Sequence, residues 1–267
     1  MFDFLKRDKR VRGAHAPQFR RCTNPPRPRP SKTPPMPSVA PPRSETPVYN
    51  APPMPDTAPC KDKFKLSQDK DGVMVIEFNN DVVSDVKVYG LEDSVRASKY
   101  PKSVDVSLCT TDVTNTTNKL GTADIGSGHD NFLNGIVVQF DLRFTVKAWT
   151  EEERYHFIDF ISSQSTMHRI TQFDLDKSYI RYVDNQIINR MKELVAQYNE
   201  DPCAENFLVV VYSNPCGFQL TARMTTNYRQ LKTIYSQRKT HRLPEWRSFC
   251  EFCEALPHSE WITGNKE

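Results

Sequence analysis

The chain has 267 residues, of which 37% are hydrophobic and 26% charged, so it can bury one core of ordinary size rather than two large ones. No stretch reaches the roughly 18 to 20 uninterrupted apolar residues of a membrane-spanning helix, and the N-terminus lacks the apolar run of a signal peptide. We therefore expect a soluble, cytoplasmic protein with no membrane contact. The formal net charge of +3 is too small to indicate nucleic-acid binding by the whole chain.

Residues 1–63 are expected to form a disordered, basic, proline-rich arm ahead of a single folded domain, residues 64–267. Fifteen of the 20 prolines lie between Pro17 and Pro59, with almost no aliphatic periodicity between them. Nine Lys and Arg residues lie between Lys6 and Arg29. The arm is either a solubilising tail or a binding segment. In the second case its positive charge would contact a nucleic acid or an acidic partner, or its PxxP motifs would dock to a protein partner.

The first half of the folded domain reads as strands. Val73–Phe78 and Ser84–Gly90 cluster β-branched residues between turn signals. The text from Thr110 to Gly128 is polar and rich in turn residues, and Gly135–Trp149 then predicts one strand or two.

The second half reads as helices, so the fold class is α+β. Apolar residues at helical spacing predict a long amphipathic helix after Asp174, which could serve as its N-cap. A second helix is expected from Thr225 to about His241, and a third is opened by Pro244. Cys250 and Cys253 have the spacing of a redox or zinc pair, but no second such pair accompanies them, which favours packing in that third helix.

The most informative text runs from Pro215 to Arg247. It resembles the closing motif of the flavin-dependent thymidylate synthases, the ThyX family, with matching positions at Pro215, Thr225, Asn227, Arg229, Leu231 and Arg238, followed by Glu245 and Arg247. Two shorter matches lie upstream in the expected order. They are GSGHDNF, which contains His129, and Val95–Ser103. Parts of the text are also similar to bacteriophage proteins, so the chain is identified as a diverged, phage-encoded member of the family.

The resemblance implies a ThyX-like fold, an antiparallel sheet followed by long C-terminal helices, in a homotetramer. It also implies an enzyme that methylates dUMP, or a related pyrimidine nucleotide, at C5 with FAD, using NADPH and methylenetetrahydrofolate as co-substrates. His129, Asn227 and Arg229 would contact FAD. Arg238 would contact the uracil ring and favour its ionised form, as the catalytic residue.

The spacing of Arg229 and Arg238 is informative apart from the resemblance. Arg229 and Arg238 are nine residues apart, about 2.5 helical turns, which places them on opposite faces of one helix. This geometry indicates a helix held between two ligands or two subunits.

The family signature RHRxxSxNExSxRY is absent, and Glu153–Thr171 stands in its place. Two registers remain open, because either Arg154 matches the first arginine of the signature or Arg169 matches the last. Phosphate binding would then fall to the polar side chains Ser162, Ser163, Ser165, Thr166, His168 and Arg169. The alternatives are that this text is only a polar loop with a helix cap, and that the chain is a catalytically inactive, virion-associated or binding module acting through its arm.

Overall fold

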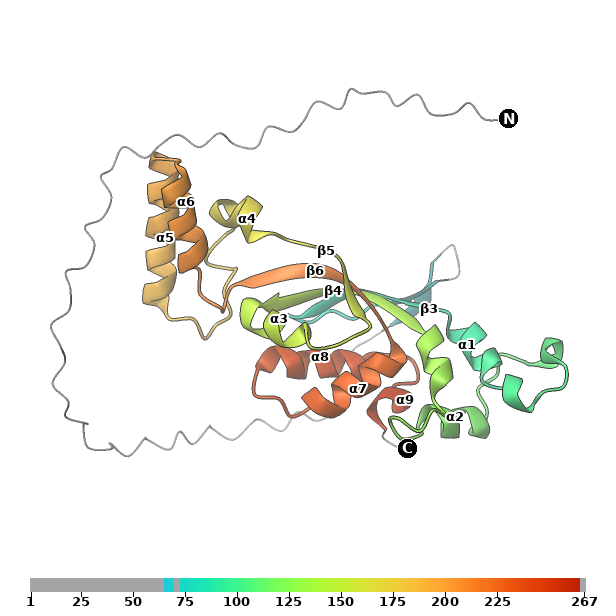
Figure 1. The fold of residues 1–267 in the computed structure, drawn as a ribbon. Helices are drawn as coiled ribbons and strands as arrows, with labels where there is room; N and C mark the ends of the chain where they lie inside the picture. Colours follow the sequence, from blue (N-terminus) through green and yellow to red (C-terminus); the bar gives the residue numbers. More distant parts are fainter. Residues whose placement is uncertain (1–64, 70–72, 265–267) are drawn as a thin grey trace, which may run out of the picture.

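The computed structural model describes residues 65–69 and 73–264, so the predicted arm lies outside the described residues (Figure 1). Six strands form one antiparallel sheet in the order β1-β2-β3-β4-β6-β5. Their bounds are β1 Leu66–Gln68, β2 Met74–Ile76, β3 Val83–Tyr89, β4 Val137–Thr145, β5 Ile158–Ser163 and β6 Gln219–Asn227.

Nine α-helices are present in the described part of the chain: α1 Leu91–Ala97, α2 Asn115–Gly121, α3 Val146–Glu152, α4 Thr166–Arg169, α5 Asn185–Glu200, α6 Ala204–Ser213, α7 Tyr228–Arg238, α8 Pro244–Ala255 and α9 Glu260–Thr263. Short 3-10 turns lie at Tyr100–Lys102, Val106–Leu108, Asn131–Gly135 and Ile170–Gln172. Among these helices, none is both long and apolar enough to cross a membrane. The predicted fold class, an antiparallel sheet with helices late in the chain, is confirmed.

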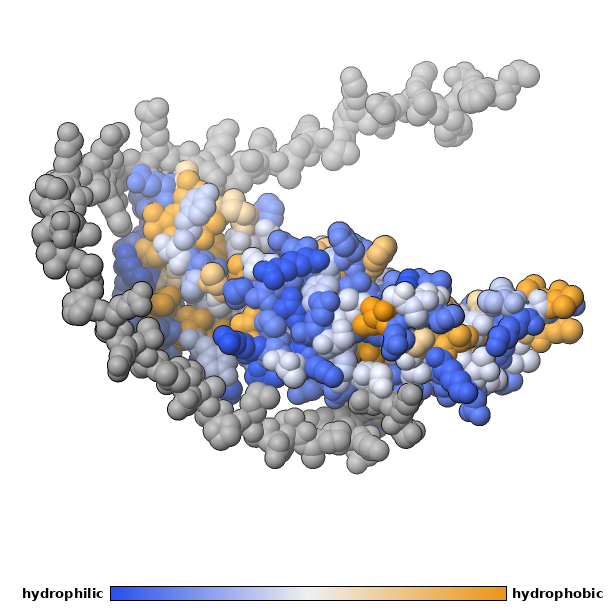
Figure 2. Space-filling model, turned by 60° about the horizontal axis from the view of Figure 1, so that its bottom comes forward, coloured by the Kyte–Doolittle hydropathy of each residue, from blue (hydrophilic) through white to orange (hydrophobic). Residues whose placement is uncertain are grey.

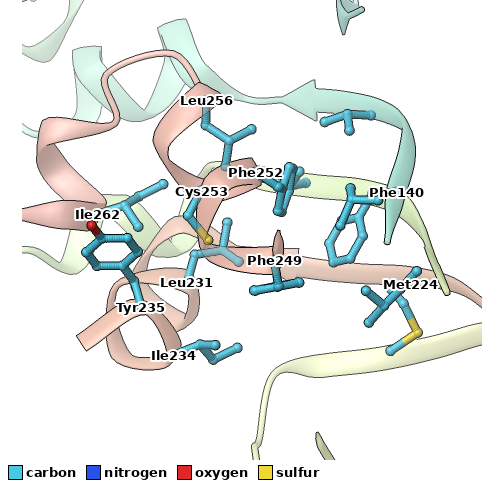
Figure 3. Close-up of a cluster of buried hydrophobic side chains, with 14 of the residues drawn as sticks. Phe140, Met224, Leu231, Ile234, Tyr235, Phe249, Phe252, Cys253, Leu256 and Ile262 are labelled. Atoms are coloured by element: carbon cyan, nitrogen blue, oxygen red, sulfur yellow. The ribbon is translucent and has the colours of Figure 1, made fainter. Parts of the chain in front are cut away.

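One face of the sheet is covered by α7, α8 and α9, and the main core lies between these layers (Figure 1). Alternate residues of β4 point into it, and Val138, Phe140, Leu142 and Phe144 are fully buried. Figure 3 shows Phe140 and Met224 on the sheet side of this core and Phe249 and Phe252 of α8 across from them. Aromatic packing is dense, since the rings of Phe140 and Phe252 have centroids 4.9 Å apart.

Cys250 and Cys253 belong to this core, as their helical spacing predicts. Burial raises the pKa of the Cys250 thiol to about 12 and that of Cys253 well above its usual value. Both thiols are therefore neutral packing groups.

Several elements begin or end at other residues than predicted, because capping side chains set their boundaries. The strand expected up to Trp149 ends at Thr145, because the Thr145 hydroxyl accepts a hydrogen bond from Ala148 N (3.1 Å) and starts α3. The long helix begins after Asp184, not Asp174: Asp184 caps Gln186 N (2.7 Å), whereas Asp174 bonds Asp176 N in a turn.

Other elements were not predicted. The Thr110–Gly128 text contains α2, which a Thr114–Thr117 capping box starts. The strands β5 and β6 and the helix α6 were also missed.

A smaller core lies under the α5–α6 hairpin, which stands at the end of the molecule opposite α1 and α2 (Figure 1). Met191 and Leu194 of α5 meet Val210 of α6 there. The outer side of α6 remains apolar, with Tyr212 83% and Leu208 44% exposed. Figure 2 shows apolar residues gathered at this end, beside a mainly hydrophilic middle.

Replacing Phe140 with Ala should lower the free energy of unfolding by about 3 to 5 kcal/mol, because it leaves a cavity between the sheet and α8. Leu108→Ala is the control, since Leu108 is 76% exposed and its loss should cost under about 0.5 kcal/mol. Chemical denaturation measures both, and equal effects would contradict this description of the core.

Candidate functional site

The long pairing of β4 with β6 sets the position of α7. Asn227, the last residue of β6, lies opposite Val137, the first residue of β4. Its side-chain Oδ1 accepts a hydrogen bond from Gln230 N (2.9 Å) and so caps α7. The helix predicted from Thr225 therefore starts at Tyr228, because Thr225 and Thr226 are still paired in the sheet.

The three residues matched to FAD gather at this end of the sheet. His129 is exposed in the turn before the 3-10 helix Asn131–Gly135, and Asp130 beside it is buried. Arg229 Nε lies 3.2 Å from Asp130 Oδ1, and Tyr228 N donates to Ile136 O (3.1 Å). The turn that carries His129 is thereby held against the start of α7, next to Asn227.

The residues expected to bind phosphate follow the edge strand β5. Arg154 is exposed in the turn after α3, before β5 begins. Ser162 and Ser163 are exposed at the end of β5, and Ser165 is the N-cap of α4 without a side-chain capping bond. Since β5 spans roughly 16 Å between its first and last residues, Arg154 and Ser163 lie at opposite ends of the strand.

Arg169 ends α4, where Nη1 donates to Gln172 Oε1 (2.7 Å). Thr166 and His168 lie on the same helix, and His168 is exposed. The segment for which a polar loop with a helix cap was the alternative is thus the end of a strand followed by one helical turn. Its polar side chains face solvent at the edge of the sheet.

Arg238 lies in a different environment. Its side chain is 10% exposed, Nη1 donates to Glu151 Oε2 (2.8 Å), and Nε donates to the Tyr155 hydroxyl (2.6 Å). The guanidinium carbon also lies 4.6 Å from the Trp246 ring centroid and 5.3 Å from that of Tyr155. Contact with a nucleotide would require this cluster to open.

The Glu151 carboxylate of this cluster pairs with two cations, Lys147 at Oε1 and Arg238 at Oε2. The hydrogen bond from Lys147, with further help from His241 and Arg238, lowers the pKa of the Glu151 carboxyl. Burial, followed by the Arg238 charge, lowers the pKa of His241, so its imidazole is neutral at pH 7. The ionised Glu151 therefore compensates the Arg238 charge in part, because Lys147 shares the same carboxylate.

The two arginines do face different partners, with Arg229 on Asp130 and Arg238 on Glu151. These carboxylates explain both faces of α7 from within one chain, so the spacing does not by itself require two ligands or two subunits. The turn after α7 is closed by Arg247, whose Nη1 donates to His241 O (2.7 Å). Glu245 is buried and accepts from the Thr145 hydroxyl (2.7 Å).

Sequence reasoning missed Asp130, Lys232 and Glu151. A local signal existed only for Asp130, which directly follows His129. Across the described ranges, no three His, Cys, Asp or Glu side chains lie close enough to hold a metal ion.

Glu152 makes stability depend on pH. Burial, with the charges of Glu153 and Asp159, raises its pKa from 4.5 to about 7. The folded state therefore holds this proton longer than the unfolded state, so stability should fall as pH rises from about 4.5 to about 7 and stay lower above that. Glu152→Gln should remove the decline and stabilise the protein at pH 8 by about 1 to 2 kcal/mol, allowing for solvent screening.

Denaturation at pH 5 and pH 8 measures this effect, with the exposed Glu205→Gln as control. A pH dependence that persists unchanged in Glu152→Gln would show that another group is responsible.

No known family profile and no curated protein sequence matches the chain. Its fold is similar to solved structures. One is the flavin-dependent thymidylate synthase ThyX of Helicobacter pylori complexed with FAD and dUMP, at 16% identity and a TM-score of 0.50, covering 67% of this chain and 95% of that one.

A second ThyX structure from Helicobacter pylori with FAD and dUMP has 14% identity and a TM-score of 0.53, covering 68% of this chain and 98% of that one. The UMP/dUMP methylase PolB of Streptomyces cacaoi, bound with 5-Br dUMP, gives 15% identity, a TM-score of 0.49 and coverage of 67% and 95%. At these identities the likeness establishes a ThyX-like fold.

Proposed function

We propose that this chain is a thymidylate synthase-like flavoenzyme that methylates dUMP or a related pyrimidine nucleotide at C5. The proposal includes FAD as cofactor and NADPH and methylenetetrahydrofolate as co-substrates. The observation that carries it is the gathering of His129, Asn227 and Arg229 at one end of a ThyX-like sheet. Similar folds in complex with FAD and dUMP support the ligand classes.

The chemistry of this end of the sheet fits a dinucleotide cofactor. Arg229 uses Nε toward Asp130, its side chain is 34% exposed, and its two terminal nitrogens make no hydrogen bond to the described residues. A guanidinium edge of this kind suits a diphosphate. The amide nitrogen of Asn227 and the exposed imidazole of His129 are further polar groups within the same region.

A bound flavin would supply the hydride chemistry. The protein's own residues would bind and orient the reactants. Along β5 and α4, the hydroxyls of Ser162, Ser163 and Ser165 and the charge of Arg169 are suited to a nucleotide phosphate. Arg154 extends this basic edge at the other end of β5. Arg238 would contact the pyrimidine only after release from Glu151.

A second candidate is a binding module that keeps the fold without catalysis. The buried state of Arg238 favours it, because the guanidinium assigned to the pyrimidine is paired with Glu151 and covered within the chain. In this case the basic arm, residues 1–63, would make the functional contact, with a nucleic acid or a protein partner.

Titration with FAD, followed by dUMP, separates the two candidates. We expect the purified protein to bind FAD, and Arg229→Ala to lose about 1.5 to 3 kcal/mol of flavin affinity, roughly ten- to more than a hundredfold. Arg242→Ala is the matched control, an exposed arginine in the turn after α7. Arg238→Ala should leave FAD binding intact and weaken dUMP binding.

Absence of FAD binding at high micromolar concentration would end the enzyme proposal. Flavin binding without dUMP binding would instead indicate a changed nucleotide substrate, in line with the altered text of β5 and α4.

We also propose that the chain is a homo-oligomer, in the tetrameric form that the family resemblance implies. The apolar outer side of α6 supports this, since Tyr212 and Leu208, four residues apart, project together from one face.

Light scattering at micromolar concentration should give a mass above that of one chain. Tyr212→Asp should lower the mass by placing a charge on this apolar face, whereas Tyr182→Asp, at another exposed tyrosine, should not. A monomeric parent protein would contradict the proposal.

A further inference from the structure

Asp130 is a buried carboxylate placed between two cations of α7. It is 1% exposed, with Arg229 Nε 3.2 Å from Oδ1 and Lys232 Nζ 3.2 Å from Oδ2. Arg229 and Lys232 are three residues apart and therefore share one face of the helix. Because a buried carboxylate is costly unless it is paired, this arrangement holds the residues around Asp130 firmly against α7.

Lys232 is itself buried, with its side chain 7% exposed. Its ammonium group has three N–H donors, and three acceptors surround it: Asp130 Oδ2, Gly121 O at 2.9 Å, and Ala123 O. Gly121 ends α2, so the cation also lies at the negative end of that helix. One side chain thus ties both ends of the segment 121–130, which carries His129, to α7.

Arg229 completes the group. Its Nε forms an ion pair with Asp130 without a hydrogen bond, and the side chain remains 34% exposed with its two terminal nitrogens without a hydrogen-bond partner in the described chain. Two cations share one carboxylate, so the group carries a net charge of +1. The guanidinium is consequently held toward Asp130 at its inner edge by charge attraction and presents an uncompensated positive charge to solvent.

We propose that Asp130 and Lys232 are positioning residues, which aim Arg229 and fix the segment 122–129 as a preformed site for a diphosphate. The identity of that diphosphate as part of FAD rests on the function proposed above. The preformed geometry does not, because it follows from contacts within the chain. A guanidinium held before binding loses less conformational entropy when its ligand arrives.

The test compares Lys232→Met and Asp130→Asn with Lys239→Met, which removes the same charge from an exposed position at the end of the same helix. Hydrogen exchange is followed in peptides covering 122–129, and affinity is measured for FAD and for inorganic pyrophosphate. We expect Lys232→Met to speed exchange of this segment at least tenfold and to weaken both ligands at least fivefold. Lys239→Met should do neither. If Lys232→Met fails to fold, Lys232→Gln replaces it, because its amide can still donate to the carbonyls.

A double-mutant cycle separates positioning from general stability. Asp130→Asn should weaken pyrophosphate about tenfold in the parent protein and much less in the Arg229→Ala background, because the part of its effect that passes through Arg229 is then absent. Equal losses in both backgrounds, or unaltered exchange of 122–129 in Lys232→Met, would overturn the inference. If the protein binds pyrophosphate but not FAD, the flavin proposal is wrong, and the double-mutant cycle with pyrophosphate still tests the positioning roles of Asp130 and Lys232. If it binds neither ligand, both proposals are wrong.

Discussion

The nine-residue pairing of β4 with β6 is the constraint on which the rest of the structure depends. It brings together strands whose sequence positions are about 80 residues apart and joins the early strands to the C-terminal helices. Its buried face, with Phe140 opposite Met224, supplies the surface on which α7 and α8 pack. Its end at Val137 and Asn227 places the His129 turn beside the start of α7. Core and candidate cofactor site therefore share one register, and a slip by one residue would disturb both.

Buried charges then fix α7 against the sheet at both of its ends. Asp130 holds Arg229 and Lys232 near the start, and Glu151 holds Arg238 at the end. Pairs of this kind contribute little as net stability but are costly to break, about 3 to 5 kcal/mol when one partner is removed. Their main effect is to define one orientation of the helix. At the first end the pairing leaves a cation facing solvent, whereas at the second it encloses the cation.

The sequence predicted the fold class because hydrophobic periodicity changes between the two halves, and the family resemblance supplied the antiparallel sheet. It failed for β6, whose sequence QLTARMTTN has few apolar residues and buries only Ala222, Met224 and Thr226. Other element boundaries differ from the predicted ones because Thr145 and Asp184 cap the helices that follow them. The site residues were assigned from a motif, and the structure places three of them, His129, Asn227 and Arg229, at the same end of the sheet. The enclosure of Arg238 was not predictable, because its partner Glu151 lies 87 residues earlier and no local pattern links them.

The place of β5 at the edge of the described sheet affects how its serines can be studied. Every second backbone N–H of an edge strand points away from its single neighbour and is available to an outside acceptor. A phosphate bound along Ser162 and Ser163 would therefore receive one main-chain N–H as well as the two hydroxyls. Exchanging these serines for alanine leaves the amides in place, so side-chain deletion underestimates what the strand contributes. Only a change to the backbone itself, such as an amide-to-ester replacement, measures that share.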